Sequence, residues 1–273
     1  MRGDVMTDSD PANLQGAYAS QYGRAARPDT AVIDQGLRSY MLRVYNYMAV
    51  GLVITGVAAV AVYMGAVTTD ADAGVRTVRN GLYLTQLGYV LFVSPAKWLV
   101  ILSPLAFIFV LNLGVERLRP ASAQVLFWLF AALVGVSLSS IFLVYTHTSI
   151  TRVFFITAAA FGALSLWGYT TQRDLAGFGS FLLMGVVGVV LASLVNIFVH
   201  SSMLQWVVSV VGVLVFAGLT AWDTQRLKNE YIYGYAQQGG DIAERAAITG
   251  ALSLYLNFIN LFTLLLQLLG QRD

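Results

Sequence analysis

The longest uncharged run of the chain, residues 175–222, reads LAGFGSFLLMGVVGVVLASLVNIFVHSSMLQWVVSVVGVLVFAGLTAW. A helix needs about 20 mainly apolar residues to cross a bilayer, so this run is too long for one crossing. A polar break at residues 200–202 (His-Ser-Ser) divides it. The stretch therefore predicts two transmembrane helices, near residues 177–198 and 203–222.

The whole chain has the composition of a membrane protein. Charged residues make up 11 % and apolar residues 58 % of the 273 residues, whereas about a quarter of a soluble domain is charged. The mean hydropathy of +0.70 agrees. A net charge of +2 without a basic cluster excludes a nucleic-acid binder, and the absence of cysteine removes disulfides and thiolate metal sites. We expect an all-α, polytopic membrane protein.

Further uncharged runs bring the expected number of spans to seven. The other five lie near residues 45–66, 98–115, 121–145, 153–172 and 246–271. The second of these spans starts earlier if it includes part of residues 80–97, which otherwise form an interfacial segment. Residues 1–37 show no helical apolar stripe, so we expect a mobile polar tail before a transmembrane domain at residues 38–273.

Lysine and arginine counts predict the orientation. With a cytoplasmic N-terminus, eleven of the 16 basic residues lie on the cytoplasmic side and five on the other. Seven spans then place the C-terminus outside, and a re-entrant last segment would place both ends inside.

Polar residues in these spans are candidates for function because burying them in a bilayer is costly. Asp223 ends the sixth span, where it either pairs with Arg226 three residues later or lines an ion or proton path. The seventh span carries one polar face, formed by Ser253, Asn257, Asn260 and Gln267. Such a face either holds helices together or lines a path, and periodicity alone favours the former.

Arg117 and Arg119 follow the second span and would ordinarily anchor it at the inner surface. Alternatively, Arg117 turns inward and pairs with Asp223 at the same depth. The sequence contains neither a nucleophile-elbow serine nor an HExxH or phosphate-loop motif. We therefore expect no enzyme and no bound cofactor.

Two stretches resemble the last two helices of the transmembrane Bax inhibitor motif family, and more closely its bacterial Bax inhibitor/YccA-type members. They are FAGLTAWDTQR at residues 216–226 and GALSLYLNFINLF at residues 250–262. The resemblance extends over about residues 38–271. It implies six helices around a central seventh and a location in the bacterial inner membrane.

The resemblance also implies a function. Bacterial members are described as pH-sensitive calcium leak proteins, and some as regulators of a membrane-bound AAA protease. In the calcium mechanism two aspartates share a proton and an arginine of the second helix acts as a latch. By this resemblance Asp223 corresponds to the first aspartate and is a possible calcium contact. Arg117 corresponds to the latch, or Arg119 does if the alignment shifts.

The second aspartate of that mechanism falls on Asn257. Two adjacent carboxylates raise one another's pKa and so sense pH, and an Asp–Asn pair loses this effect. Asn257 can still donate a hydrogen bond to ionised Asp223 or offer its carbonyl oxygen to calcium. We expect weaker calcium binding and a weaker or shifted pH response than in relatives with both aspartates.

The sequence leaves three functions open. The first is a pH-sensitive leak of calcium or another cation through the helix bundle, with Asp223, Asn257, Asn260 and Ser253 along the path. The second is modulation of a membrane-bound AAA protease through the tail or loops. The third is a structural membrane protein whose polar face only holds helices together.

Overall fold

The computed structural model describes residues 30–79, 81–114, 119–235 and 240–272, and the expected tail at residues 1–29 lies outside these ranges. The helices are α2 (Thr30–Ala66), α3 (Gln86–Phe92), α4 (Lys97–Gly114), α5 (Pro120–Leu138), α6 (Ile141–Val144), α7 (His147–Thr170), α8 (Ala176–Val199), α9 (Ser202–Tyr233) and α10 (Gly240–Leu269). Three short strands, β1 (Val67–Thr68), β2 (Arg76–Arg79) and β3 (Leu82–Leu84), lie between α2 and α3.

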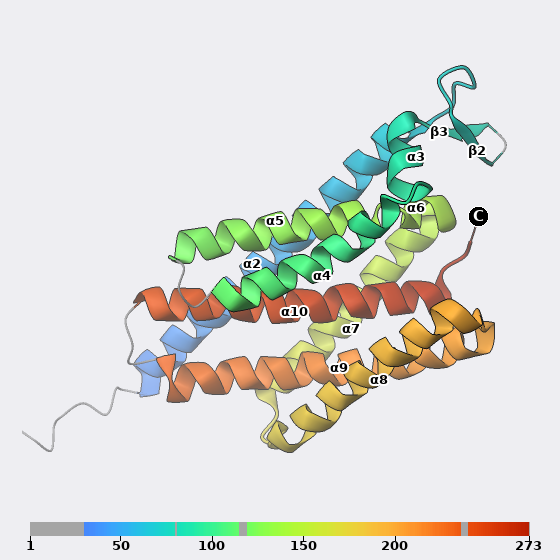
Figure 1. The fold of residues 1–273 in the computed structure, drawn as a ribbon. Coiled ribbons are helices and arrows are strands. Elements are labelled where there is room, and N and C mark those ends of the chain that lie inside the picture. Colours follow the sequence, from blue (N-terminus) through green and yellow to red (C-terminus); the bar gives the residue numbers. More distant parts are fainter. Residues whose placement is uncertain (1–29, 80, 115–118, 236–239, 273) are drawn as a thin grey trace, which may run out of the picture.

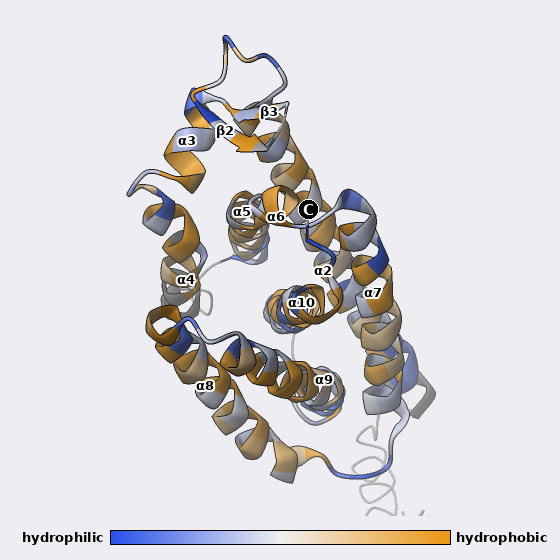
Figure 2. Ribbon diagram, turned by 90° about the vertical axis from the view of Figure 1, so that its right-hand side faces the viewer, coloured by the Kyte–Doolittle hydropathy of each residue, from blue (hydrophilic) through white to orange (hydrophobic). Residues whose placement is uncertain are grey.

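The helices form an elongated bundle with α10 at its centre (Figures 1 and 2). α10 packs against α2, α5, α7 and α9. In the described part of the chain, α8 packs extensively against α9 only. In the most apolar stretch of each helix, half of the residues of α10 are buried, whereas only 11 % of those of α8 are buried. The predicted all-α membrane fold with a central last helix is confirmed.

Among the described residues, six helices are long and apolar enough to cross a membrane, and the number is seven if the bent pair of α3 and α4 forms one span. The bend is 60° and falls between Phe92 and Lys97, where Pro95 lacks the N–H that a continuous helix would use. Figure 1 shows α4 running from the end that carries the strands to the end where α5 begins. The described residues 81–97 thus contain β3, α3 and the start of α4, and the bent pair of helices is either a broken span or a re-entrant loop.

The long uncharged run divides where its polar break predicts. α8 ends at Val199, and His200 adopts the left-handed conformation with φ 54°. The side chain of Ser201 accepts a hydrogen bond from the backbone N–H of Leu204 and so caps α9. Ser201 N–H in turn donates to Asn196 Oδ1 at 2.9 Å. The break therefore ends one helix and begins the next within three residues.

α2 begins at Thr30, earlier than the domain boundary expected at residue 38. Leu37, Tyr40, Met41 and Val44 are all at most 6 % exposed and belong to the main hydrophobic core. Their spacing of three or four residues places them on one face of a helix. The helix thus includes residues of the segment expected as tail, and Leu37 among them is buried by the bundle.

A small antiparallel sheet at one end of the bundle was not expected from the sequence. β3 is its central strand and pairs with β1 and β2. Each strand is two to four residues long, which is too short for an alternating pattern to identify. The sheet joins α2 to α3 and leaves the all-α architecture of the bundle unchanged.

The C-terminal residues fix the far end of α10. Thr146 N–H donates to Gln271 O at 3.1 Å, and Gln271 N–H donates to Ser149 Oγ at 2.9 Å. α10 therefore traverses the bundle and ends opposite the start of α2 (Figure 1). Of the two expected layouts, this is the one without a re-entrant last segment.

Candidate functional site

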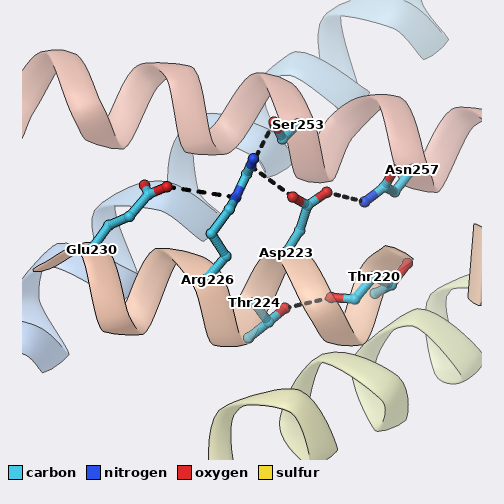
Figure 3. Close-up of polar contacts among 7 residues, drawn as sticks. All are labelled: Thr220, Asp223, Thr224, Arg226, Glu230, Ser253 and Asn257. Atoms are coloured by element: carbon cyan, nitrogen blue, oxygen red, sulfur yellow. Dashed lines mark hydrogen bonds and ion pairs between the residues drawn. The ribbon is translucent and has the colours of Figure 1, made fainter. Parts of the chain in front are cut away.

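Asp223 and Asn257 meet in the buried interface between α9 and α10 (Figure 3). Each residue is 5 % exposed. Asn257 Nδ2 donates a hydrogen bond to Asp223 Oδ2 at 2.7 Å, which is one of the two contacts that the sequence left open for this amide. A hydrogen bond to a charged acceptor is stronger than one between neutral groups, so this contact both links the helices and stabilises the carboxylate.

Arg226 supplies the positive charge for Asp223. Its Nη2 lies 2.6 Å from Asp223 Oδ1 and donates to Ser253 Oγ at 3.3 Å. Its Nε lies 3.7 Å from Glu230 Oε1. The interpretation of Asp223 as paired with Arg226, one helical turn later, is confirmed. Both carboxylate oxygens of Asp223 are therefore occupied, one by a cation and one by an amide.

Of the two expected latch residues, only Arg119 lies in the part of the chain that the structure describes. Within the described residues the ion-pair partner of Asp223 is Arg226. Arg119 is exposed and precedes α5 as a helix cap without a side-chain hydrogen bond. Arg117 lies outside the described residues. The role of Arg117 as a latch therefore stays a prediction.

The polar face of α10 divides into separate contacts rather than one continuous line. Asn260 Nδ2 donates to Leu256 O of its own helix at 2.8 Å. Gln267 Oε1 accepts from Ser209 Oγ at 2.8 Å, toward the other end of α9. Only Ser253 and Asn257 join the network around Asp223. Asn260, expected on the path, is tied to its own backbone.

A cavity of about 510 Å³ adjoins this network. It lies where α5 and α10 begin and α9 ends, and it is lined by Arg226, Glu230 and Ser253 together with apolar residues such as Phe127 and Leu227. The described residues hold no group of three or more His, Cys, Asp or Glu side chains that could bind a metal ion. Asp223 is the buried carboxylate of this network, and Glu230 is the more exposed carboxylate that lines the cavity.

The sequence pattern of the family described as "Inhibitor of apoptosis-promoting Bax1" matches residues 37–273. The chain belongs to this family. The match covers the whole described bundle apart from the start of α2, so the family assignment applies to the fold and to the α9–α10 interface alike.

Among similar proteins of the Bax inhibitor family is the inner membrane protein YbhL of Escherichia coli strain K12. It is 42 % identical over 252 residues, which cover 91 % of this chain and 99 % of YbhL. An uncharacterized protein of Caulobacter vibrioides is 45 % identical over 91 % of this chain and 96 % of its own. The protein RP147 of Rickettsia prowazekii is 42 % identical over 88 % of this chain and 92 % of its own.

Sequence reasoning missed one member of the site, Glu230. It follows Arg226 by four residues, and this spacing places two side chains on one helical face. The same spacing is common on solvated helix surfaces, where such pairs have little effect on stability. Asp223, Arg226 and Glu230, at successive turns of α9, are therefore recognisable as a row only once the cavity beside them is known.

Proposed function

We propose that this Bax inhibitor family protein is a leak pathway for calcium or another cation through the bacterial inner membrane, with its N-terminus in the cytoplasm. The observation that supports this most is the buried carboxylate of Asp223, which is held by Arg226 at the edge of a cavity. Ionised residues within a membrane bundle commonly mark ion or proton paths because burying them is costly. The inner-membrane location rests on the similarity to YbhL.

The path begins in the cavity and leads to Asp223. Calcium prefers carboxylate, amide and hydroxyl oxygens, and Asp223, Asn257 and Ser253 provide all three kinds within one network. In the described state Arg226 occupies the cation's place at Asp223 Oδ1. Opening therefore means that the guanidinium leaves this oxygen, and Asn257 then turns its carbonyl oxygen toward the ion.

The pH response follows from the same residues. A pair of aspartates would share a proton and titrate as a coupled unit, whereas here an amide holds the one buried carboxylate. We propose a weaker or shifted pH response than in relatives with two aspartates. Restoring the second carboxylate by Asn257→Asp should make the response steeper.

The test is calcium efflux from proteoliposomes at about pH 6, 7 and 8, a range that coupled carboxylates reach when one pKa is raised. We expect the natural protein to leak, Asp223→Asn to reduce the leak to the level of empty vesicles, and Asn257→Asp to steepen its pH dependence. Asp72→Asn is the matched control, because Asp72 is an exposed carboxylate in the segment between β1 and β2. It should leave the leak unchanged.

Two results would contradict this proposal. An unchanged leak in Asp223→Asn would remove the carboxylate from the path. Efflux no faster than from empty vesicles, in the natural protein and in both site variants, would reject the leak. The alternative proposal, contact with a membrane-bound AAA protease through the cytoplasmic tail or loops, would then take its place.

A further inference from the structure

Arg226 lies between two carboxylates of its own helix. Asp223 precedes it by three residues and Glu230 follows it by four, so all three side chains share one face of α9 (Figure 3). The guanidinium contacts Asp223 closely, at 2.6 Å, and approaches Glu230 only to 3.7 Å. The arginine is thus bonded to one carboxylate while a second one lies within reach.

The two carboxylates differ in their surroundings. The side chain of Asp223 is 7 % exposed and that of Glu230 is 41 % exposed. Glu230 and Arg226 both line the cavity of about 510 Å³. A guanidinium that moves from Asp223 toward Glu230 therefore moves out of the helix interface toward the cavity.

The second contact of Arg226 is incomplete. Its Nε is buried and has no hydrogen-bond partner among the described residues, because 3.7 Å to Glu230 exceeds hydrogen-bond length. A shift of about 1 Å would bring Arg226 Nε and Glu230 Oε1 to 2.7–2.9 Å, the usual distance of a charge-assisted hydrogen bond. Buried N–H groups are nearly always hydrogen-bonded in native proteins, so the hydrogen bond that the shift would form favours it.

The surface beneath the guanidinium permits such movement. Arg226 Cζ lies 4.8 Å above the centre of the Trp222 ring, and stacking on an aromatic face does not fix the in-plane position of a planar cation. The neighbouring basic residue of α9, Lys228, is bound elsewhere, since its Nζ donates to Tyr169 O at 2.8 Å. Arg226 is the basic residue of this helix that both carboxylates approach.

We propose that Glu230 is the second acceptor of Arg226, and that exchange of the guanidinium from Asp223 to Glu230 is the opening step of the site. Glu230 is then a positioning residue, which acts on the cation path through Arg226. The inference rests on the proposed leak function for its consequence, but the exchange itself does not depend on transport. It gives the chain a gate contained within two turns of one helix.

A double-mutant cycle in the efflux assay tests the role of Glu230. Without the second acceptor Arg226 stays on Asp223, so Glu230→Gln should lower the leak about threefold to fivefold, the size expected for a partly exposed ion pair. In the Arg226→Gln background the same substitution should have no effect. Glu244→Gln, which removes a partly buried carboxylate near the start of α10 that accepts from Tyr47 Oη, should leave the leak unchanged.

An equal loss in both backgrounds would overturn the inference, because Glu230 would then attract cations merely as a surface charge. An unchanged leak in Glu230→Gln would overturn it as well. Both results leave the proposed leak function intact, because that function is tested by the efflux of the natural protein and of Asp223→Asn.

A second measurement tests the exchange of the guanidinium and does not depend on a leak. The side-chain Nε–H resonance of Arg226 can be followed by nitrogen NMR in the full-length protein in detergent. We expect Glu230→Gln and Asp223→Asn to displace it in opposite directions, as for a cation shared between two acceptors. A resonance that Glu230→Gln leaves in place would show that Glu230 is no acceptor and would overturn the proposal.

Discussion

At the end of the bundle that carries the C-terminus, α9 and α10 are joined by one neutral hydrogen bond, from Ser209 to Gln267. At the other end the same two helices are joined by Asp223, Arg226, Ser253 and Asn257, with a charge of each sign. Hydrogen bonds between membrane helices contribute about 0.6 kcal/mol on average, and the ion pair of Asp223 with Arg226 lies within α9 and does not itself join the two helices. Neutral groups suffice to join these helices, so the charges at one end call for a functional explanation.

The largest effect is expected from Arg226→Gln. This change leaves the carboxylate of Asp223 buried without its cation. We expect a loss of about 2 kcal/mol in the free energy of unfolding, less than for a fully buried pair, because the Arg226 side chain is 35 % exposed. Denaturant unfolding in detergent measures it. Adding Asp223→Asn should recover most of the loss, and a double variant as unstable as Arg226→Gln would contradict the pairing.

A smaller effect is expected from Asn257→Leu, which removes the donor to Asp223 Oδ2. Hydrogen bonds to charged groups contribute about 1.5–3 kcal/mol, so we expect a loss near the lower value while Arg226 remains. Asn260→Leu is the matched control in the same unfolding assay, because its amide bonds only to Leu256 O of its own helix. If both variants lost equal stability, the Asp223–Asn257 bond would have no special role.

The smallest effect is expected at the neutral end. Ser209→Ala removes the donor to Gln267 and should lower the unfolding free energy by about 0.6 kcal/mol. Its calcium efflux should equal that of the natural protein. A change in efflux as large as that expected for Asp223→Asn would extend the path along the whole α9–α10 interface and remove the contrast between its ends.

Much of the fold and part of the site follow from the sequence because they depend on local spacing. Uncharged runs place the helices, the polar break at residues 200–202 divides α8 from α9, and the contacts of Asp223 with Arg226 and Asn257 follow from position and chemistry. These features require only helix geometry and the cost of burying charge.

The features that sequence reasoning missed depend on tertiary contacts. The strands at residues 67–84 are too short to show a period. α2 begins at Thr30, and Leu37, within the segment expected as tail, is buried by the bundle. Glu230 is notable because it lines the cavity beside α9, and four-residue spacing from an arginine does not distinguish it from an ordinary surface residue.

The position of Asp223 along α9 has a consequence for how the site responds to the membrane potential. The apolar part of α9, residues 203–222, rises about 30 Å at 1.5 Å per residue, which matches the hydrocarbon thickness. Asp223 follows at once, and Arg226 and Glu230 lie one and two turns beyond it. A charge gains about 2.3 kcal/mol per 100 mV only if it crosses the whole field. The proposed exchange of the guanidinium would take place where little of that field remains, so we expect the proposed gate to respond hardly at all to voltage.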